Sequence, residues 1–576
     1  MFTRLSLLTA FALVVPAAHL GALQSLATRE KLSLRGAVTE LATGVALENA
    51  RVTLFTPNLS LFRETRTGSA GRYGIGAVPA GTYRLGVALP DYGYQEQAVT
   101  IGPGLTQLDL ELGPETDTGS WAIIGNTLPE TLDATDIGVL LPDGRIFYCH
   151  DTTDPILFNP TDGTKSFPPA SGSPQGCMNS TLLSDGSVLI VGGQDGSNPG
   201  DFVNGIPWVK RFQAPDQWTD PPDLVHTPGR WYPGLARLAD GSLLAMGGGQ
   251  SPDATRTETC ERMNLSNFTW SYTDSLATPL EFPPSALLYT GDVLQTWGGQ
   301  PQLYDPVVES WSSTGNFVFP SRGWPGHSDH SLLVLTDGSA LAVGVNPISQ
   351  PGASMTERYD PASKTWSTGT SPSLVRFQAE VVYLPDGSVF IGGGDKGVQG
   401  GVEPDVLGIV RRCDLHDPDS GSWRRIPNMS WYREYHAVTL LLHDGRIATT
   451  GGTYIKFSFG PTSADIEAYS PPYLSRGVRP QLSGLSDPTP SRGTNVDVQV
   501  FPATRLTHAV LMGMQSTTHW LDAGIPRRLE LPIVQSGSTA TIQFPSDPDL
   551  LPLGWYLLFG MVDDIPSVAL SVRVDA

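Results

Sequence analysis

The 576-residue chain is long enough for several domains, and its 63 Gly, 49 Pro and only 16% charged residues are typical of short strands joined by tight turns. The formal net charge of −21 argues against nucleic acid and anionic membrane surfaces as partners, because their phosphates would be repelled. We therefore expect an all-β protein that acts on a neutral or weakly polar small molecule.

The first residues have the pattern of an export signal. Arg4 supplies a positive start, residues 5–18 are apolar, and small residues up to Ala27 offer cleavage sites. No later stretch has the roughly 18 consecutive apolar residues of a membrane-spanning helix. The sequence thus predicts a signal peptide over residues 1–27 and a secreted protein without a membrane span.

Residues 28–115 alternate apolar and polar side chains in short runs separated by Gly and Pro, which predicts a small β-sandwich. The segment from Thr67 to Gly76, followed by Val78-Pro-Ala-Gly-Thr-Tyr83, resembles the carboxypeptidase regulatory-like domain. Domains of that type are accessory, and this segment contains no catalytic grouping.

One signal then repeats: an apolar run, an Asp-Gly pair and a second apolar strand. The six Asp-Gly pairs begin at Asp143, Asp185, Asp240, Asp337, Asp386 and Asp444, and a reversed Gly291-Asp292 fills the long gap. The six intervals cover 301 residues, so the period is about 50 residues, the length of a kelch blade. The sequence predicts a seven-bladed kelch-type β-propeller over residues 116–472 and, from the short strands that follow, a C-terminal immunoglobulin-like β-sandwich over residues 473–576.

Three side chains that can bind a metal occupy the same position in three repeats. Cys177, Tyr232 and His436 each lie eight residues before the Asp of their turn, at the start of a strand expected near the propeller axis. A thiol, a phenol and an imidazole on one axis form a donor set for a transition metal, and imidazole nitrogen with phenolate oxygen suits Cu(II). Tyr435 offers a second phenol. The same count in the other four repeats gives Thr135, Pro284, Asp329 and Gln378.

Separate motifs occur in order along the second part of the chain: Gly229-Arg-Trp-Tyr-Pro233, Arg433-Glu-Tyr-His436, Glu467-Ala-Tyr-Ser-Pro-Pro-Tyr-Leu474, and Gly554-Trp-Tyr-Leu-Leu-Phe559 with Ile565-Pro-Ser567. Together they resemble the copper radical oxidases, the galactose oxidase and glyoxal oxidase family, from residue 121 to the C-terminus. The Arg-Trp-Tyr-Pro and Ser-Pro-Pro-Tyr-Leu forms are closer to the glyoxal oxidases.

The resemblance implies a metal site and a protein-derived cofactor. One copper ion would be bound by Tyr232, Tyr435, His436 and His519, the last of these in a Thr518-His519 sequence that precedes two arginines. Tyr232 would be joined to Cys177 by a thioether, and the linked side chain would hold the radical. Galactose oxidase stacks a tryptophan on this tyrosine from just after its third-repeat glycines, where this chain has Gly249-Gln250.

The activity implied is a copper-dependent oxidase reaction of primary alcohols or simple aldehydes with O2, which releases H2O2. Tyr435 would take the hydroxyl proton of the substrate. Candidate substrate contacts are Arg322, Asp329 and His330 near the fifth repeat's inner position and Gln378 in the sixth, with a hydrogen-bonded surface loop as the open alternative for the fifth-repeat group.

A rival hypothesis is a secreted kelch propeller that has lost catalysis and binds glycan or cell-wall material. A binding module has no reason to keep a thiol, two phenols and two imidazoles in one ring. We expect the protein to be a monomer. We also expect Cys149, Cys260 and Cys413 to be packed thiols unless one pair oxidises after export.

Overall fold

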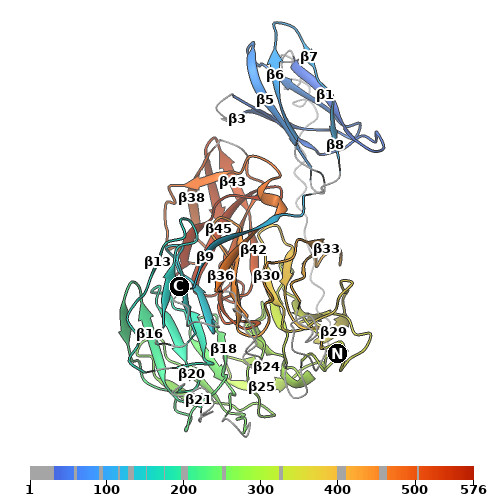
Figure 1. Ribbon diagram of the computed structural model, residues 1–576. Helices are drawn as coiled ribbons and strands as arrows, with labels where there is room; N and C mark the ends of the chain where they lie inside the picture. Colours follow the sequence, from blue (N-terminus) through green and yellow to red (C-terminus); the bar gives the residue numbers. More distant parts are fainter. Residues whose placement is uncertain are drawn as a thin grey trace, which may run out of the picture. The chain divides into compact units, whose positions relative to one another are not determined.

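The structure is a computed structural model that describes residues 32–56, 61–89, 92, 95–113, 117–127, 135–150, 152, 154–173, 175–195, 205–249, 255–323, 328–397, 410–452, 464–501 and 505–576. Within these ranges the elements are strands and two short 3-10 turns, Trp297–Gly299 and Pro472–Leu474 (Figure 1). The all-β prediction is therefore confirmed. The expected signal peptide lies outside the described residues, and no helix among those described has the length and apolarity needed to cross a membrane.

The chain divides into a compact unit that ends at residue 116 and a second unit over residues 117–576. The strands of the first unit are β1 (Leu32–Glu40), β2 (Arg51–Phe55), β3 (Leu61–Arg66), β4 (Arg72–Gly76), β5 (Gly81–Ala88), β6 (Gln95–Ile101), β7 (Thr106–Gln107) and β8 (Leu110–Leu112). They form one sheet of order β4-β1-β7, with β8 also on β1, and another of order β3-β2-β5-β6. Leu34 and Tyr73 of the first sheet share an apolar core with Val52 and Leu85 of the second.

Seven sheets, which we call ring sheets one to seven, follow in the described part of the second unit. The strands of the first three are β10 (Ile137–Leu140), β11 (Ile146–Cys149), β12 (Ile156–Phe158), β13 (Lys165–Ser166), β14 (Asn179–Leu182), β15 (Val188–Val191), β16 (Val209–Gln213), β17 (Gln217–Thr219), β18 (Gly234–Arg237), β19 (Leu243–Met246), β20 (Cys260–Met263) and β21 (Trp270–Thr273). Within each of these three sheets, every strand pairs with the next in chain order, from the inner strand β10, β14 or β18 outward.

Ring sheets four to seven repeat this order. Their strands are β22 (Ser285–Leu287), β23 (Val293–Gln295), β24 (Gln302–Asp305), β25 (Ser310–Ser313), β26 (Ser331–Val334), β27 (Ala340–Val343), β28 (Thr356–Asp360), β29 (Thr365–Thr368), β30 (Glu380–Tyr383), β31 (Val389–Gly392), β32 (Cys413–His416), β33 (Trp423–Ile426), β34 (Ala437–Leu441), β35 (Ile447–Gly451) and β36 (Asp465–Ser470). The seventh sheet is completed by β9 (Ser120–Asn126), which pairs with β36.

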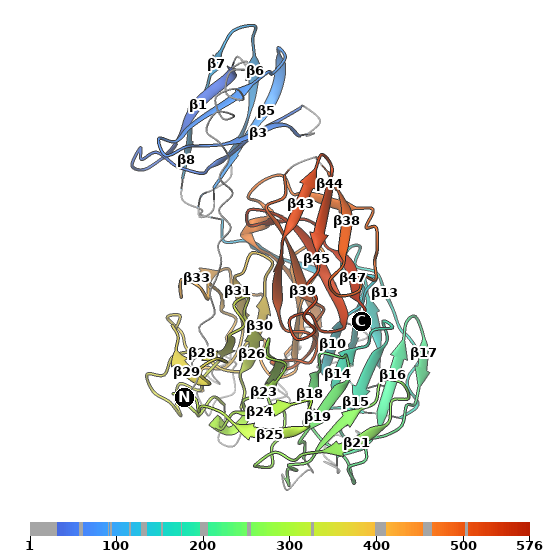
Figure 2. The same ribbon diagram turned by 180° about the vertical axis from the view of Figure 1, so that it is seen from behind.

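The inner strands contact one another in a closed series. β10 contacts β14, and the contacts continue through β18, β22, β26, β30 and β34 back to β10; Figure 2 shows several of these strands side by side. The Asp-Gly pairs form the turns between the first and second strands. In the second sheet, for example, the Ser187 N–H donates to Asp185 Oδ1 at 2.9 Å, while Gly186 adopts φ 82°, a conformation that glycine takes without strain.

The C-terminal part contains two further sheets and a hairpin. The strands are β37 (Gln481–Ser483), β38 (Asn495–Phe501), β39 (His508–Gly513), β40 (Ser516–Thr518), β41 (Leu521–Asp522), β42 (Arg528–Leu531), β43 (Ile533–Ser536), β44 (Thr539–Gln543), β45 (Gly554–Val562), β46 (Ile565–Pro566) and β47 (Leu570–Val574). The sheets have the orders β37-β38-β44-β43 and β42-β39-β45-β46, with β47 on β45, and they share one core that includes Val498, Leu511 and Tyr556. The hairpin β40/β41 leaves these sheets and pairs with β10.

Candidate metal centre

Four of the seven positions found by counting back from the turns share a backbone conformation. Cys177, Tyr232, Gln378 and His436 have φ values of 50°, 52°, 52° and 63°, in the left-handed region that non-glycine residues rarely adopt. The Tyr232 N–H donates to the Cys177 carbonyl at 3.3 Å, and the Gln378 N–H donates to the Asp329 carbonyl at 2.9 Å. Backbone hydrogen bonds thus join these positions in neighbouring sheets.

In the fourth ring sheet, the structure places Phe282 at this position, and the expected Pro284 was wrong. Phe282 has φ 47°, and its N–H donates to the Tyr232 carbonyl at 2.9 Å. The count began at Asp292, but in the reversed Gly291-Asp292 pair the glycine occupies the usual glycine position of the turn. In the other repeats the ring position lies nine residues before the glycine of the turn, and nine residues before Gly291 is Phe282.

The hairpin β40/β41 carries His519 into the ring. The Ser516 and Ser180 hydroxyls are 2.9 Å apart, and the Ser331 hydroxyl donates to the Trp520 carbonyl at 2.8 Å. These bonds attach the hairpin to the second and fifth ring sheets. His519 lies in the turn between its strands with φ 54°, and its Nδ1 is 2.8 Å from the Thr518 hydroxyl.

Four of the five residues expected at the copper site converge. The Tyr232 and Tyr435 hydroxyls are hydrogen-bonded to each other. The Tyr435 ring stacks on His436 at a centroid distance of 4.1 Å and lies 4.6 Å from the ring of His519, and the two imidazoles lie 4.5 Å apart. Two phenols and two imidazoles from three parts of the chain therefore lie together.

Both imidazoles are suited to metal binding. Both side chains are buried. Within the described structure, the two ring nitrogens of His436 and the Nε2 of His519 make no hydrogen bond. Burial lowers the pKa of each histidine to about 3, so both are neutral at ordinary pH. A neutral imidazole with an unused lone pair beside phenolic oxygens is an N/O donor set for a transition metal.

Cys177 is the fifth expected residue and packs in the same cluster as Tyr232 and Phe282. Gln194 Nε2 is 3.7 Å from its sulfur. Burial, and secondarily the charge of Asp136, raises the pKa of the thiol well above its usual value. Cys177 is therefore a protonated thiol beside a phenol when no metal is bound.

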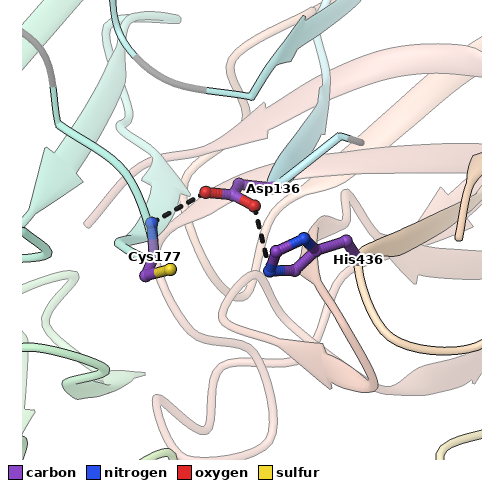
Figure 3. A group of neighbouring side chains, drawn as sticks. All are labelled: Asp136, Cys177 and His436. Carbon is purple, nitrogen blue, oxygen red and sulfur yellow. Dashed lines mark hydrogen bonds and ion pairs between the residues drawn. The ribbon is translucent and has the colours of Figure 1, made fainter. Parts of the chain in front are cut away.

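Asp136 is a site residue that the sequence analysis missed. Its Oδ2 accepts the Cys177 backbone N–H at 2.7 Å, and its Oδ1 lies 3.3 Å from His436 Nε2 (Figure 3). Its carboxylate oxygen, the Cys177 sulfur and a nitrogen of His436 lie within 4.8 Å of one another. The sequence did contain a clue to Asp136. It directly follows Thr135, the residue that the count from the Asp-Gly turn gave for the first repeat.

Aromatic side chains enclose the phenol of Tyr232. Trp231 lies beside it at a centroid distance of 4.5 Å and an interplanar angle of 32°, and Phe282 lies at 4.4 Å. Trp520, from the hairpin, is 6.4 Å from Tyr435. A tryptophan thus packs on Tyr232, and it is the residue immediately before Tyr232 in the sequence. Galactose oxidase has its stacked tryptophan at the position of Gln250, which lies outside the described residues.

Two candidate substrate residues contact each other. Asp329 and Gln378 occupy the ring position in the fifth and sixth sheets, and the Gln378 amide donates to Asp329 Oδ2 at 3.1 Å. His330 is directed elsewhere, because its Nε2 lies 2.9 Å from the Thr296 hydroxyl and its ring packs edge-on against Phe317. His330 therefore has a packing role in the structure.

Arg322 belongs to a repeated buried ion pair and is not exposed to a substrate. The residue is 0% exposed, and its guanidinium donates to the Glu357 carboxylate and the Gly344 carbonyl. Equivalent buried pairs join Arg230 to Glu261, Arg376 to Asp414 and Arg433 to Glu467. The expectation that Arg322 contacts a substrate is corrected accordingly.

Comparison with known proteins identifies two family models. Residues 479–574 match the galactose oxidase-like early set domain, and residues 33–113 match the carboxypeptidase regulatory-like domain. A galactose oxidase of Gibberella zeae is 25% identical over 432 residues, which are 69% of this chain and 60% of that protein. An aldehyde oxidase of Arabidopsis thaliana is 24% identical over 455 residues, which are 69% of this chain and 71% of that protein.

A solved structure has a similar fold. It is described as a novel fungal alcohol oxidase in complex with copper, and the similarity has a TM-score of 0.66 at 18% identity, over 80% of this chain and 100% of that one. The matched segments are galactose oxidase-like at residues 479–574 and carboxypeptidase regulatory-like at residues 33–113. The two resemblances expected from the motifs, to the galactose oxidase and glyoxal oxidase family and to the carboxypeptidase regulatory-like domain, are confirmed. The chain spans three fifths of the length of the galactose oxidase that it matches.

Proposed function

We propose that the chain is a secreted copper radical oxidase that oxidises primary alcohols or simple aldehydes with O2 and releases H2O2. The observation that carries the proposal is the convergence of Tyr232, Tyr435, His436 and His519, with Cys177 packed in the cluster around Tyr232. The relatives named galactose oxidase and aldehyde oxidase, and the copper-bound alcohol oxidase of similar fold, support the same chemistry.

We propose that the seven ring sheets are the blades of one kelch-type propeller over residues 116–472, between β-sandwiches over residues 28–115 and 473–576. The closed series of inner-strand contacts supports the propeller. The pairing of β9 with β36 supports closure, because it joins the first strand of the second unit to the last ring sheet. The apolar cores shared by the paired sheets at each end support the sandwiches.

Copper fits the donor set, since the two imidazoles have unused nitrogens and the two phenols face them. Tyr232, Tyr435, His436 and His519 would hold the ion. When bound, copper would act as a Lewis acid toward the substrate oxygen and accept one electron.

The second one-electron acceptor in this proposal is the Tyr232 side chain linked to Cys177. Forming the carbon–sulfur bond removes one hydrogen from the thiol and one from the ring, and O2 takes up both as H2O2. Trp231 and Phe282, at 4.5 and 4.4 Å from the Tyr232 ring, cover it from bulk water. An oxidised phenol in such an enclosure is protected from side reactions with water.

The reaction divides between the two phenols. Tyr435, whose hydroxyl is hydrogen-bonded to that of Tyr232, receives the hydroxyl proton of the substrate, which is an alcohol or the hydrate of an aldehyde. The oxidised Tyr232 takes a hydrogen atom from the adjacent carbon. The substrate thereby loses two electrons and two protons, O2 gains them, and the products are a carbonyl compound and H2O2. Asp329 and Gln378, hydrogen-bonded to each other at the ring position of the fifth and sixth sheets, are the proposed polar contacts for the substrate.

The proposal is tested by mass spectrometry of the full chain before and after aerobic copper loading. A linked peptide pair that contains Cys177 and Tyr232, two hydrogens lighter than the separate peptides, is expected. A peroxide-coupled screen with glyoxal-like aldehydes, diols and galactose then measures the activity, and size-exclusion chromatography tests the expected monomer. Separate peptides despite bound copper would contradict the radical mechanism and favour the catalytically inactive glycan-binding propeller.

A further inference from the structure

Asp136 is a buried carboxylate that joins two residues of the proposed copper site. It immediately precedes β10, is 1% exposed, and lies between the backbone of Cys177 and the ring of His436 (Figure 3). Each of its oxygens faces a different one of these residues. Burying a carboxylate is costly unless its oxygens are paired, so each oxygen of Asp136 is expected to have a partner.

The first oxygen fixes the position of the thiol. Asp136 Oδ2 accepts the Cys177 N–H at 2.7 Å, and Cys177 has the unfavourable φ of 50°. A hydrogen bond to a charged acceptor is roughly twice as strong as one between neutral groups. The carboxylate therefore helps to hold Cys177 in a backbone conformation that places its sulfur in the cluster around Tyr232.

The second oxygen faces the imidazole. Asp136 Oδ1 makes no hydrogen bond to other described residues, and the nitrogen within reach is Nε2 of His436, at 3.3 Å. If Nε2 carries the proton and donates it to this oxygen, Nδ1 keeps its lone pair, and Nδ1 is also buried without a hydrogen bond in the described structure. A carboxylate that accepts the N–H of a metal-binding histidine fixes both its tautomer and its orientation.

We propose that Asp136 is the positioning residue of this centre: it sets the tautomer and orientation of His436 for copper and holds the Cys177 thiol for thioether formation. This inference rests on the proposed function of the site. It assigns one role to each carboxylate oxygen, and the two roles can be separated by substitution.

Asp136→Asn and Asp136→Ala separate the roles. The Asn oxygen still accepts the Cys177 N–H, but its amide NH2 faces Nε2 of His436, where an acceptor is needed. We expect Asn to weaken copper binding about 10- to 100-fold and to form the thioether at close to the wild-type rate once copper is saturating. Ala lacks both oxygens, so we expect it to form the thioether about tenfold more slowly even at saturating copper.

The experiment measures copper affinity by competition with a chelator, the Cu(II) electron paramagnetic resonance spectrum, and the time course of the linked peptide pair. Glu380→Gln is the matched control, because Glu380 is a buried carboxyl of β30 whose neighbours are Thr439 and Arg433. Thermal unfolding checks that each variant is folded, and the nearly isosteric Asn variant carries the test if Ala does not fold.

If the Asn and Ala variants match the wild type in copper affinity, spectrum and thioether rate, the role of Asp136 is overturned. The proposed function would remain intact. A wild-type chain that binds no copper or forms no thioether would overturn the proposed function, and this inference with it. Weakened copper binding in Asn, with slow thioether formation in Ala, supports both roles.

Discussion

The imidazoles of His436 and His519 lie edge to face with their centroids 4.5 Å apart, although His436 immediately precedes an inner strand and His519 comes from the C-terminal hairpin. The two residues meet because the β40/β41 hairpin pairs with β10 and hydrogen-bonds to the second and fifth ring sheets. The site is thus shared between the ring sheets and the segment that follows them.

His519→Ala is expected to lower copper affinity by more than about 100-fold, since in the proposed site His519 is a direct ligand and not only a supporting group. Chelator competition measures the change. His508→Ala is the control, because His508 begins β39 and hydrogen-bonds to Thr507 outside the site. Equal losses in the two variants would mean that His519 acts through the stability of the C-terminal part.

Cys177→Ser should abolish the linked peptide pair while copper still binds, because the phenols and imidazoles remain. Peroxide formation is expected to fall to background, and mass spectrometry follows the modification directly. Cys260→Ser replaces another buried thiol, on β20, and should retain both the link and the activity. Full activity in the Cys177 variant would contradict the thioether-based mechanism.

Arg322→Met should lower the free energy of unfolding by about 3–5 kcal/mol, because it leaves the Glu357 carboxylate buried without its partner. Denaturant unfolding measures this change. Arg358→Met, which breaks a partly exposed pair with Asp337, should cost only about 0–1 kcal/mol. If Arg322→Met instead raised KM with unchanged stability, the substrate role first expected for Arg322 would be restored.

Burial raises the pKa of Glu380 from 4.5 to about 8 in the folded chain. Between these pH values the folded state binds more protons than the unfolded state at this residue, so its contribution to stability falls as the pH rises. Glu380→Gln should remove this slope, which is at most about 1.4 kcal/mol per pH unit. The free energy of unfolding is measured for both proteins from pH 5 to pH 8. As the pH rises, the wild type should lose stability relative to the variant. A constant difference would show that Glu380 titrates normally.

The sequence was informative where a local turn sets the spacing. The Asp-Gly turn fixes where each inner strand begins, so a count of eight residues identified Cys177, Tyr232 and His436. The same count failed in the fourth sheet, where the turn is reversed and Phe282 takes the position.

Asp136 could not be assigned in this way, because its contacts are between sheets. It is one residue past the counted position, and its partners come from the second and seventh ring sheets. Spacing within one repeat does not give distances between repeats. The position of His519 followed only from the family resemblance, since it depends on how the C-terminal hairpin enters the ring.

The pairing of β9 with β36 and the late position of β40/β41 also determine the order of assembly. During synthesis, the seventh sheet can be completed only after residue 470 has emerged, and His519 emerges later still. A nascent or truncated chain therefore has the thiol and both phenols before it has all the residues of the proposed copper site. If the proposed function holds, oxidation at Tyr232 therefore has to wait until the β40/β41 hairpin has been made and has paired with β10.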